Sequence, residues 1–334
     1  MSVNYGETNI LHRRQWILRI VPCSAVAIIL LVLPAFLPFY LQNIMSKVII
    51  FALFAMSLDI VMGYTGLISL GHAAFFGVGG YAAAILIKKC GITSFWIICP
   101  LAILITAASA AILGIIALRV SGIYFLLVTL ALSLLLQNIA NKWYSMTRGT
   151  DGILGIPSPD LGLSSLFSWS STGLYYFILV IFVICSFLIF RIVNSPFGNA
   201  LQGIRENEHR MEVLGYNTWL YKYLALIIGG SFAGVAGILF AHYNGIIAPF
   251  HLGITTSTLA MLMCIIGGLG TVWGPIIGSF IIILVEYFSS ILVPERWPLV
   301  LGAVFVISVM TLRGGIAQQL LRLREKLFYG SIKG

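Results

Sequence analysis

Long hydrophobic runs separated by short polar stretches organise the whole sequence. Most of these runs approach the roughly 20 residues that a helix needs to cross a bilayer, and they do not alternate as barrel strands do. Since backbone groups in lipid must bond within the chain, the pattern predicts an all-α polytopic membrane protein with about eight to ten transmembrane helices. The runs lie near 18–38, 44–62, 70–88, 95–118, 122–140, 172–191, 220–242, 255–267, 274–291 and 298–313.

Composition supports the bilayer as the solvent for most of the chain. The 334 residues are 60% hydrophobic and 9% charged, whereas soluble domains are about 25% charged. We expect a single transmembrane domain over 18–315, between an N-terminal tail at 1–17 and a basic C-terminal tail at 316–334. The run 255–267 is short, and the pattern leaves open whether 255–291 forms two spans or a re-entrant hairpin.

The net charge of +9 is a signal of topology rather than of nucleic-acid binding. When the runs alternate across the membrane, one side collects both tails and the polar stretch 195–217, and it holds most of the Lys and Arg residues. The excess of basic residues predicts that this side and both termini are cytoplasmic. The longest loop on the other side is 141–171.

The stretch 195–217 has the pattern of a capped amphipathic helix. Ser195 suits the N-cap and Pro196 the first turn, while Gly215 suits a left-handed C-terminal cap. The predicted apolar face consists of Phe197, Leu201, Ile204, Met211 and Leu214, and Arg205 is expected to pair with Glu208. Such a helix either docks in a groove of a partner or lies on lipid headgroups.

Two glycine-rich breaks interrupt the apolar runs, at 63–72 and at 267–275. Breaks at membrane depth line a cavity or are buried by protein, and glycines also allow close helix packing. Both interpretations stay open from the residues alone. The candidate positions for a translocation path are Asp59, Gly63, Tyr64, Gly66, Gly71, His72, Gly267, Gly268 and Gly270.

Asp59 is a carboxylate within an apolar run, where it is expected to face the protein interior. It either binds a substrate ammonium or relays a proton, or it bonds to backbone near the first glycine break. We favour the structural role, and we expect His72 to be a hydrogen-bonded structural histidine as well.

Motifs of enzymes are absent from the sequence. It contains no G-x-x-x-x-G-K-[ST] phosphate loop and no hydrolase or metal-ligand motif, and its five cysteines are scattered. We therefore expect a chain that is not an enzyme and binds no metal or cofactor.

Five stretches follow one another along the chain: GYTGLISLGHAAFFGVGGY at 63–81, SGIYFLLVTLA at 121–131, RGTDGILGIP at 148–157, the whole of 195–217, and GGLGTVWGPIIG at 267–278. In this order they resemble the LivM-type permease subunits of branched-chain amino acid ABC transporters. The likeness runs from about residue 40 to 315. His209 and Arg210 depart from the small or apolar residues expected at these positions.

The resemblance implies a permease in a bacterial-type inner membrane that translocates branched-chain amino acids. Its implied partners are two ATPase subunits, which use ATP and Mg, a second related permease, and an external solute-binding protein that touches 141–171 and 244–254. The resemblance also makes 195–217 a coupling helix that inserts into an ATPase subunit. Its implied residues are Ser195, Pro196, Phe197, Gly198, Leu201, Ile204, Arg205, Glu206, Asn207, Glu208, Met211, Leu214 and Gly215.

Three alternatives remain at this point. The same machinery would serve urea or short amides, and the sequence separates these cargoes poorly. A proton- or sodium-coupled secondary transporter would use Asp59 as its coupling group. A purely structural subunit would only hold a partner permease.

Overall fold

The structure is a computed structural model that describes residues 38–160, 171–292, 297–311, 314–317 and 319. Its elements confirm an all-α fold, and each predicted run from 44–62 onward corresponds to one helix. The predicted run 18–38, the tail 1–17 and most of the tail 316–334 lie outside the described residues. The helices are α2 Phe39–Asp59, α3 His72–Lys88, α4 Phe95–Ala117, α5 Ile123–Lys142, α6 Tyr144–Thr147, α7 Ser171–Val193, α8 Pro196–Glu206, α9 Glu208–Val213, α10 Thr218–Asn244, α11 Ile254–Gly267, α12 Gly274–Leu292 and α13 Trp297–Thr311.

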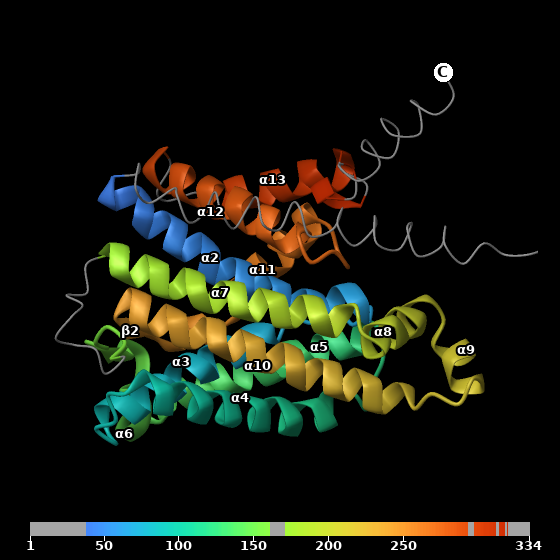
Figure 1. Ribbon diagram of the computed structural model, residues 1–334, viewed down its shortest axis with the longest axis horizontal. Helices are drawn as coiled ribbons and strands as arrows, with labels where there is room; N and C mark the ends of the chain where they lie inside the picture. Colours follow the sequence, from blue (N-terminus) through green and yellow to red (C-terminus); the bar gives the residue numbers. More distant parts are fainter. Residues whose placement is uncertain (1–37, 161–170, 293–296, 312–313, 318, 320–334) are drawn as a thin grey trace, which may run out of the picture.

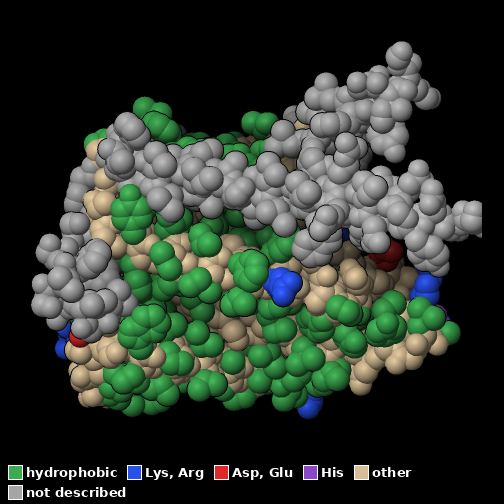
Figure 2. All heavy atoms as spheres, in the orientation of Figure 1, with side chains coloured by type: hydrophobic (Ala, Val, Ile, Leu, Met, Phe, Trp, Pro, Cys, Tyr) green, Lys and Arg blue, Asp and Glu red, His purple; other side chains and the backbone are tan. Residues whose placement is uncertain are grey.

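The long helices run roughly side by side in an elongated bundle (Figure 1). Six helices of the described chain are long and apolar enough to cross a membrane, and α3 and α11 are shorter apolar helices. The helices α2 and α10 form the centre, with 89% and 72% of their apolar windows buried, whereas only 28% of α4 and 22% of α5 are buried. Hydrophobic side chains accordingly extend along the surface with few charges among them (Figure 2), as lipid contact requires.

Close approach of α3 to α10 depends on glycine. A Cβ on Gly79 would lie 2.4 Å from the carbonyl oxygen of Gly234, and one on Gly237 would lie 1.8 Å from that of Phe76. Either distance is too short for any side chain. Small residues at these positions therefore serve helix packing, which is one of the two roles expected for membrane glycines.

The two ends of the bundle carry different structures (Figure 1). The short helices α8 and α9 lie at one end, and α6 and the strand β2 lie at the other. There β1 (Ile153–Leu154) pairs antiparallel with β2 (Ile246–Ile247), so the segments that carry the two strands lie together at this end.

The segment before α11 enters the bundle instead of staying at its end. The hydroxyl of Ser133 in α5 donates to the carbonyl oxygen of Leu252 at 2.6 Å, and a Cβ on Gly77 of α3 would lie 2.3 Å from Leu252. With 14 residues, α11 is about 21 Å long at 1.5 Å per residue, too short for a full span. The stretch 255–291 is thus a partial helix, α11, followed by the longer helix α12.

Candidate functional site

The two glycine breaks and the last turn of α8 meet at the end of the bundle that carries α8 and α9. The first break begins where α2 passes into a π-helix, η2, over Ile60–Tyr64. Thr65 ends it, because its hydroxyl donates back to the carbonyl oxygen of Val61 at 2.5 Å, and Gly66 then turns the chain with a φ of +77°. Single π-turns inside helices often mark functional positions.

The second break is a tight turn between α11 and α12. Gly268 and Gly270 have φ values of +118° and +71°, which residues other than glycine rarely adopt. Thr271 closes the turn, because its hydroxyl donates to the carbonyl oxygen of Gly268 at 2.7 Å and accepts from the backbone N–H of Gly274 at 3.1 Å.

Asp59 joins the two breaks. Its side chain is buried, with 2% of the residue exposed, and its Oδ1 accepts from the backbone N–H of Gly270 at 2.9 Å. The expected bond to backbone is therefore present, but it goes to the second break and not to the first. Gly63 permits this contact, since a Cβ there would lie 2.0 Å from Asp59 Oδ1 and 2.4 Å from the Gly270 nitrogen.

The remaining path candidates near the first break pack against other helices. His72 is fully buried, and its Nε2 lies 2.9 Å from the Ser57 hydroxyl, so it is hydrogen-bonded as expected. A Cβ on Gly71 would lie 2.3 Å from the carbonyl oxygen of Thr129 in α5. Tyr64 is also buried. These three residues are part of the packed interior.

The stretch 195–217 forms two helices, and the prediction of one continuous helix is wrong. Asn207 has extended φ and ψ values of −158° and 97°, and its side chain accepts from the backbone N–H of Arg210 at 2.9 Å. It therefore ends α8 and caps α9. Ser195 and Pro196 occupy the predicted start, and Gly215 has the predicted left-handed conformation with a φ of +89°.

The predicted apolar face of this stretch is divided between the interior and the surface. Leu201 and Ile204 are 1% and 3% exposed and pack on the chain itself, so they are not available to a partner. Phe197 stacks on Tyr221 of α10 with ring centroids 5.5 Å apart. Leu214 is 65% exposed, and its neighbour Val213 is 75% exposed. The sequence pattern did not single out Val213.

The expected pair between Arg205 and Glu208 does not form. Arg205 instead donates through Nη1 to the carbonyl oxygen of Gly63 in η2, while Glu208 pairs with Lys222 of α10. Only 11% of the Lys222 side chain is exposed. Lys222 was missed as a site residue because its partner lies 14 positions earlier in the chain.

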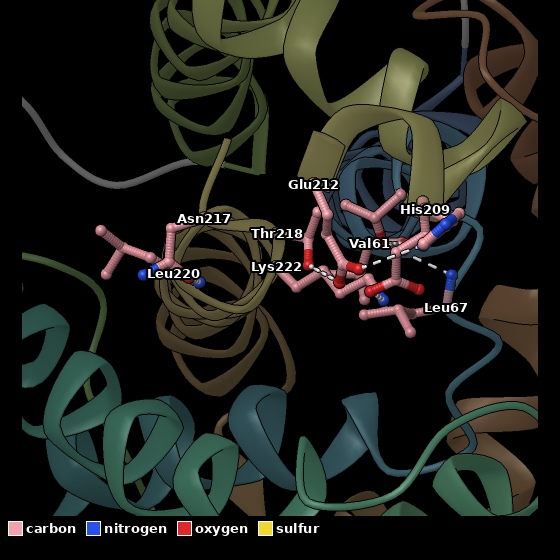
Figure 3. Close-up of polar contacts among 10 residues, drawn as sticks. Val61, Leu67, His209, Glu212, Asn217, Thr218, Leu220 and Lys222 are labelled. Carbon is pink, nitrogen blue, oxygen red and sulfur yellow. Dashed lines mark hydrogen bonds and ion pairs between the residues drawn. The ribbon is translucent and has the colours of Figure 1, made fainter. Parts of the chain in front are cut away.

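A second contact fixes α9 to α10. The hydroxyl of Thr218 donates to Glu212 at 3.1 Å, and Glu212, Thr218 and Lys222 lie together on one side of the start of α10, opposite Asn217 and Leu220 (Figure 3). His209 is 3.8 Å from Glu212 but 88% of its side chain is exposed. Within the described residues, no group of His, Cys, Asp and Glu is arranged to hold a metal ion.

A sequence model of the permease component of branched-chain amino acid transport systems matches residues 40–309, which include both breaks and the whole of 195–217. The chain belongs to this permease family. It is a multi-pass membrane permease, in agreement with the six helices of the described residues that are long and apolar enough to cross a membrane.

Several curated relatives agree with the family assignment. The chain is 29% identical to the high-affinity branched-chain amino acid permease LivM of Salmonella typhimurium, over 87% of this chain and 73% of the relative. It is also 29% identical to LivM of Escherichia coli, over 91% and 77% of the two chains. The permease LivH of Salmonella typhimurium is 27% identical, over 81% and 93%. No solved structure matches the chain significantly.

Proposed function

We propose that this permease is the transmembrane subunit of an ATP-driven importer for branched-chain amino acids, and that α8 and α9 couple it to an ATPase subunit. The observation that carries the coupling role is the contact between Arg205 of α8 and the π-helix η2. Through it, the short helices at the surface touch the first break directly. A mere loop helix on lipid headgroups has no need of such a contact.

The docking surface for the ATPase is the exposed apolar end of α9. Val213 and Leu214 project from a helix that is fixed to α10 by the Lys222–Glu208 pair. Exposed apolar residues on a polar, anchored helix fit a hydrophobic groove on a protein partner. The ATPase subunits, not this chain, bind ATP and Mg.

The basic residues of the two tails set the orientation in this proposal. Among the described residues both ends carry Lys and Arg, with Arg191, Arg205, Arg210 and Lys222 at the end of α8 and α9 and Lys88, Lys89, Lys142 and Arg148 at the other. The predicted alternation of the spans puts both basic tails on the side of α8 and α9, so we place this end and both termini in the cytoplasm of a bacterial-type cell. The opposite end, with the paired strands β1 and β2, then receives the external binding protein.

A second permease chain completes the pathway in this proposal. The chain is similar to both LivM and LivH permeases, which supports a pair of related subunits. Two permeases and two ATPase subunits give one assembly, in which this chain supplies one half of the path and the binding protein supplies most of the selectivity.

Uptake by cells that lack only this chain tests the cargo. We expect the deletion to abolish the uptake of labelled leucine, and the intact chain to restore it. If the intact chain restores the uptake of urea but not of leucine, the proposed machinery stands and its substrate is urea. Uptake of leucine that persists at the normal rate in the deletion strain, with no second system present, would refute the proposal.

A further inference from the structure

One cluster at the α8 end joins three separate parts of the chain through backbone atoms. Arg205 comes from α8, Gly63 and Asp59 from η2 and the residue before it, and Gly270 from the turn between α11 and α12. Arg205 Nη1 donates to the Gly63 carbonyl oxygen, and the Gly270 N–H donates to Asp59 Oδ1 at 2.9 Å. Each charged side chain thus holds the backbone of a glycine break.

Steric evidence places the two contacts next to each other. A Cβ on Gly270 would lie 2.8 Å from Arg205 Nη1 and 3.1 Å from the Gly63 oxygen, and a Cβ on Gly66 would lie 3.2 Å from Arg205 Cγ. The guanidinium therefore lies where the two breaks touch, and only glycine leaves it room. Arg205 therefore connects α8 directly to this junction.

The junction between the two breaks is shielded from water in this structure. All five residues of η2 are buried, and Asp59 is 2% exposed, so water does not reach the carboxylate. A charge in such a place is costly unless it is hydrogen-bonded. The Gly270 N–H supplies a bond to Oδ1, whereas Oδ2 is buried and has no hydrogen-bond partner among the described residues. Separation of the two breaks would break the bond to Gly270 and expose Asp59.

We propose that Asp59, Gly63, Arg205 and Gly270 form a latch that transmits the movement of α8 to both glycine breaks and keeps this end of the pathway closed. Arg205 is the positioning residue of this latch. It moves the first break through the Gly63 carbonyl, and Asp59 makes the second break follow. This inference rests on the proposed function, because the movement that the latch transmits is the one that an ATPase subunit would impose on α8.

The latch makes a prediction that a purely structural role does not share. A hydrogen bond from a charged donor shifts an equilibrium by about tenfold or more. Arg205→Gln should therefore lower the leucine transported per ATP hydrolysed by about tenfold in the full complex, while assembly and ATP hydrolysis persist. Arg205→Lys keeps the charge but not the planar guanidinium whose Nη1 makes the bond, and its leucine transport per ATP should lie between those of the wild type and Arg205→Gln.

The experiment uses the complete complex in proteoliposomes with its binding protein, and it measures leucine uptake and phosphate release together. Arg119→Gln is the matched control, because Arg119 is an exposed arginine beyond the end of α4, expected on the same side of the membrane. It should leave the transport per ATP unchanged. A wild-type complex without ATP-dependent uptake would refute the proposed function, whereas an active wild type isolates the test of the latch.

Two results would overturn the latch in an active complex. One is Arg205→Gln with the same leucine per ATP as the wild type. The other is a parallel fall of assembly, ATP hydrolysis and uptake at a constant ratio, which would make Arg205 only a folding contact. If Arg205→Gln does not assemble at all, Arg205→Lys is measured instead. The same leucine transport per ATP in Arg205→Lys as in the wild type would also contradict the latch.

Discussion

Replacing Gly63 by alanine tests the contact of the two glycine breaks most sharply. The added Cβ would lie 2.0 Å from Asp59 Oδ1 and 2.4 Å from the Gly270 nitrogen, far inside van der Waals contact. The neighbours are a buried side chain and a backbone atom, so neither moves freely. The methyl group must therefore push the Asp59 carboxylate away from the Gly270 N–H and break the hydrogen bond between them.

The magnitude follows from two costs. Overpacking a buried site costs about 1–3 kcal/mol, and the loss of a hydrogen bond to a charged group costs about 1.5–3 kcal/mol. The helical preference of alanine over glycine returns at most about 1 kcal/mol. We expect Gly63→Ala to lower the free energy of unfolding by about 3 kcal/mol and to abolish leucine uptake.

Gly302→Ala is the matched control for this substitution. It places the same methyl group in α13, where nothing lies within 4 Å of the new Cβ. Thermal unfolding of the purified complex in lipid nanodiscs and leucine uptake in cells are the two assays. Equal stability and equal uptake of Gly63→Ala and Gly302→Ala would refute the described contact between the breaks.

Three further predictions follow from the contacts. Gly215→Pro fixes φ near −65° where the chain has +89°, and it should abolish uptake while the subunit still inserts, so normal uptake would contradict the role of α9. Asp59→Asn keeps an oxygen that accepts from Gly270, and its effect should be mild: a neutral acceptor forms the bond at about half strength, which is a loss of about 1 kcal/mol or about fivefold in uptake. Complete loss of uptake at normal expression would instead place Asp59 in the path. Lys47 and Glu286 pair at 3.0 Å with side chains only 31% and 21% exposed, so water screens the pair only in part. A double-mutant cycle on thermal stability should give a coupling of about 1–2 kcal/mol, and a value near zero would contradict the pair.

The membrane helices and the two ends of the 195–217 stretch could be predicted from the sequence. Apolar length predicted the long helices from α2 onward, and Ser195 and Gly215 marked the ends of 195–217 because caps depend on local backbone chemistry. Asn207, which ends α8 and caps α9, was not predicted. The π-helix at Ile60–Tyr64 left no such signal, since it depends on the packing of the whole bundle.

The contacts of the site could not be predicted, because each joins residues far apart in the chain. Arg205 was expected to pair with Glu208 three positions away, yet its partner is Gly63, 142 positions earlier. Asp59 bonds to Gly270 across 211 positions. Helical spacing also could not show which side of 195–217 faces inward, so Leu201 and Ile204 looked as available to a partner as Leu214.

The central claim is that an ATPase drives this permease through α8 and α9. Identifying the energy source of uptake tests this claim most directly. Leucine uptake by cells that carry the intact chain should be measured with a protonophore at constant ATP, and again after ATP is depleted at a constant proton gradient. We predict that uptake resists the protonophore and stops when ATP is depleted. Uptake that collapses with the protonophore and survives the loss of ATP would contradict the account and make Asp59 a coupling group.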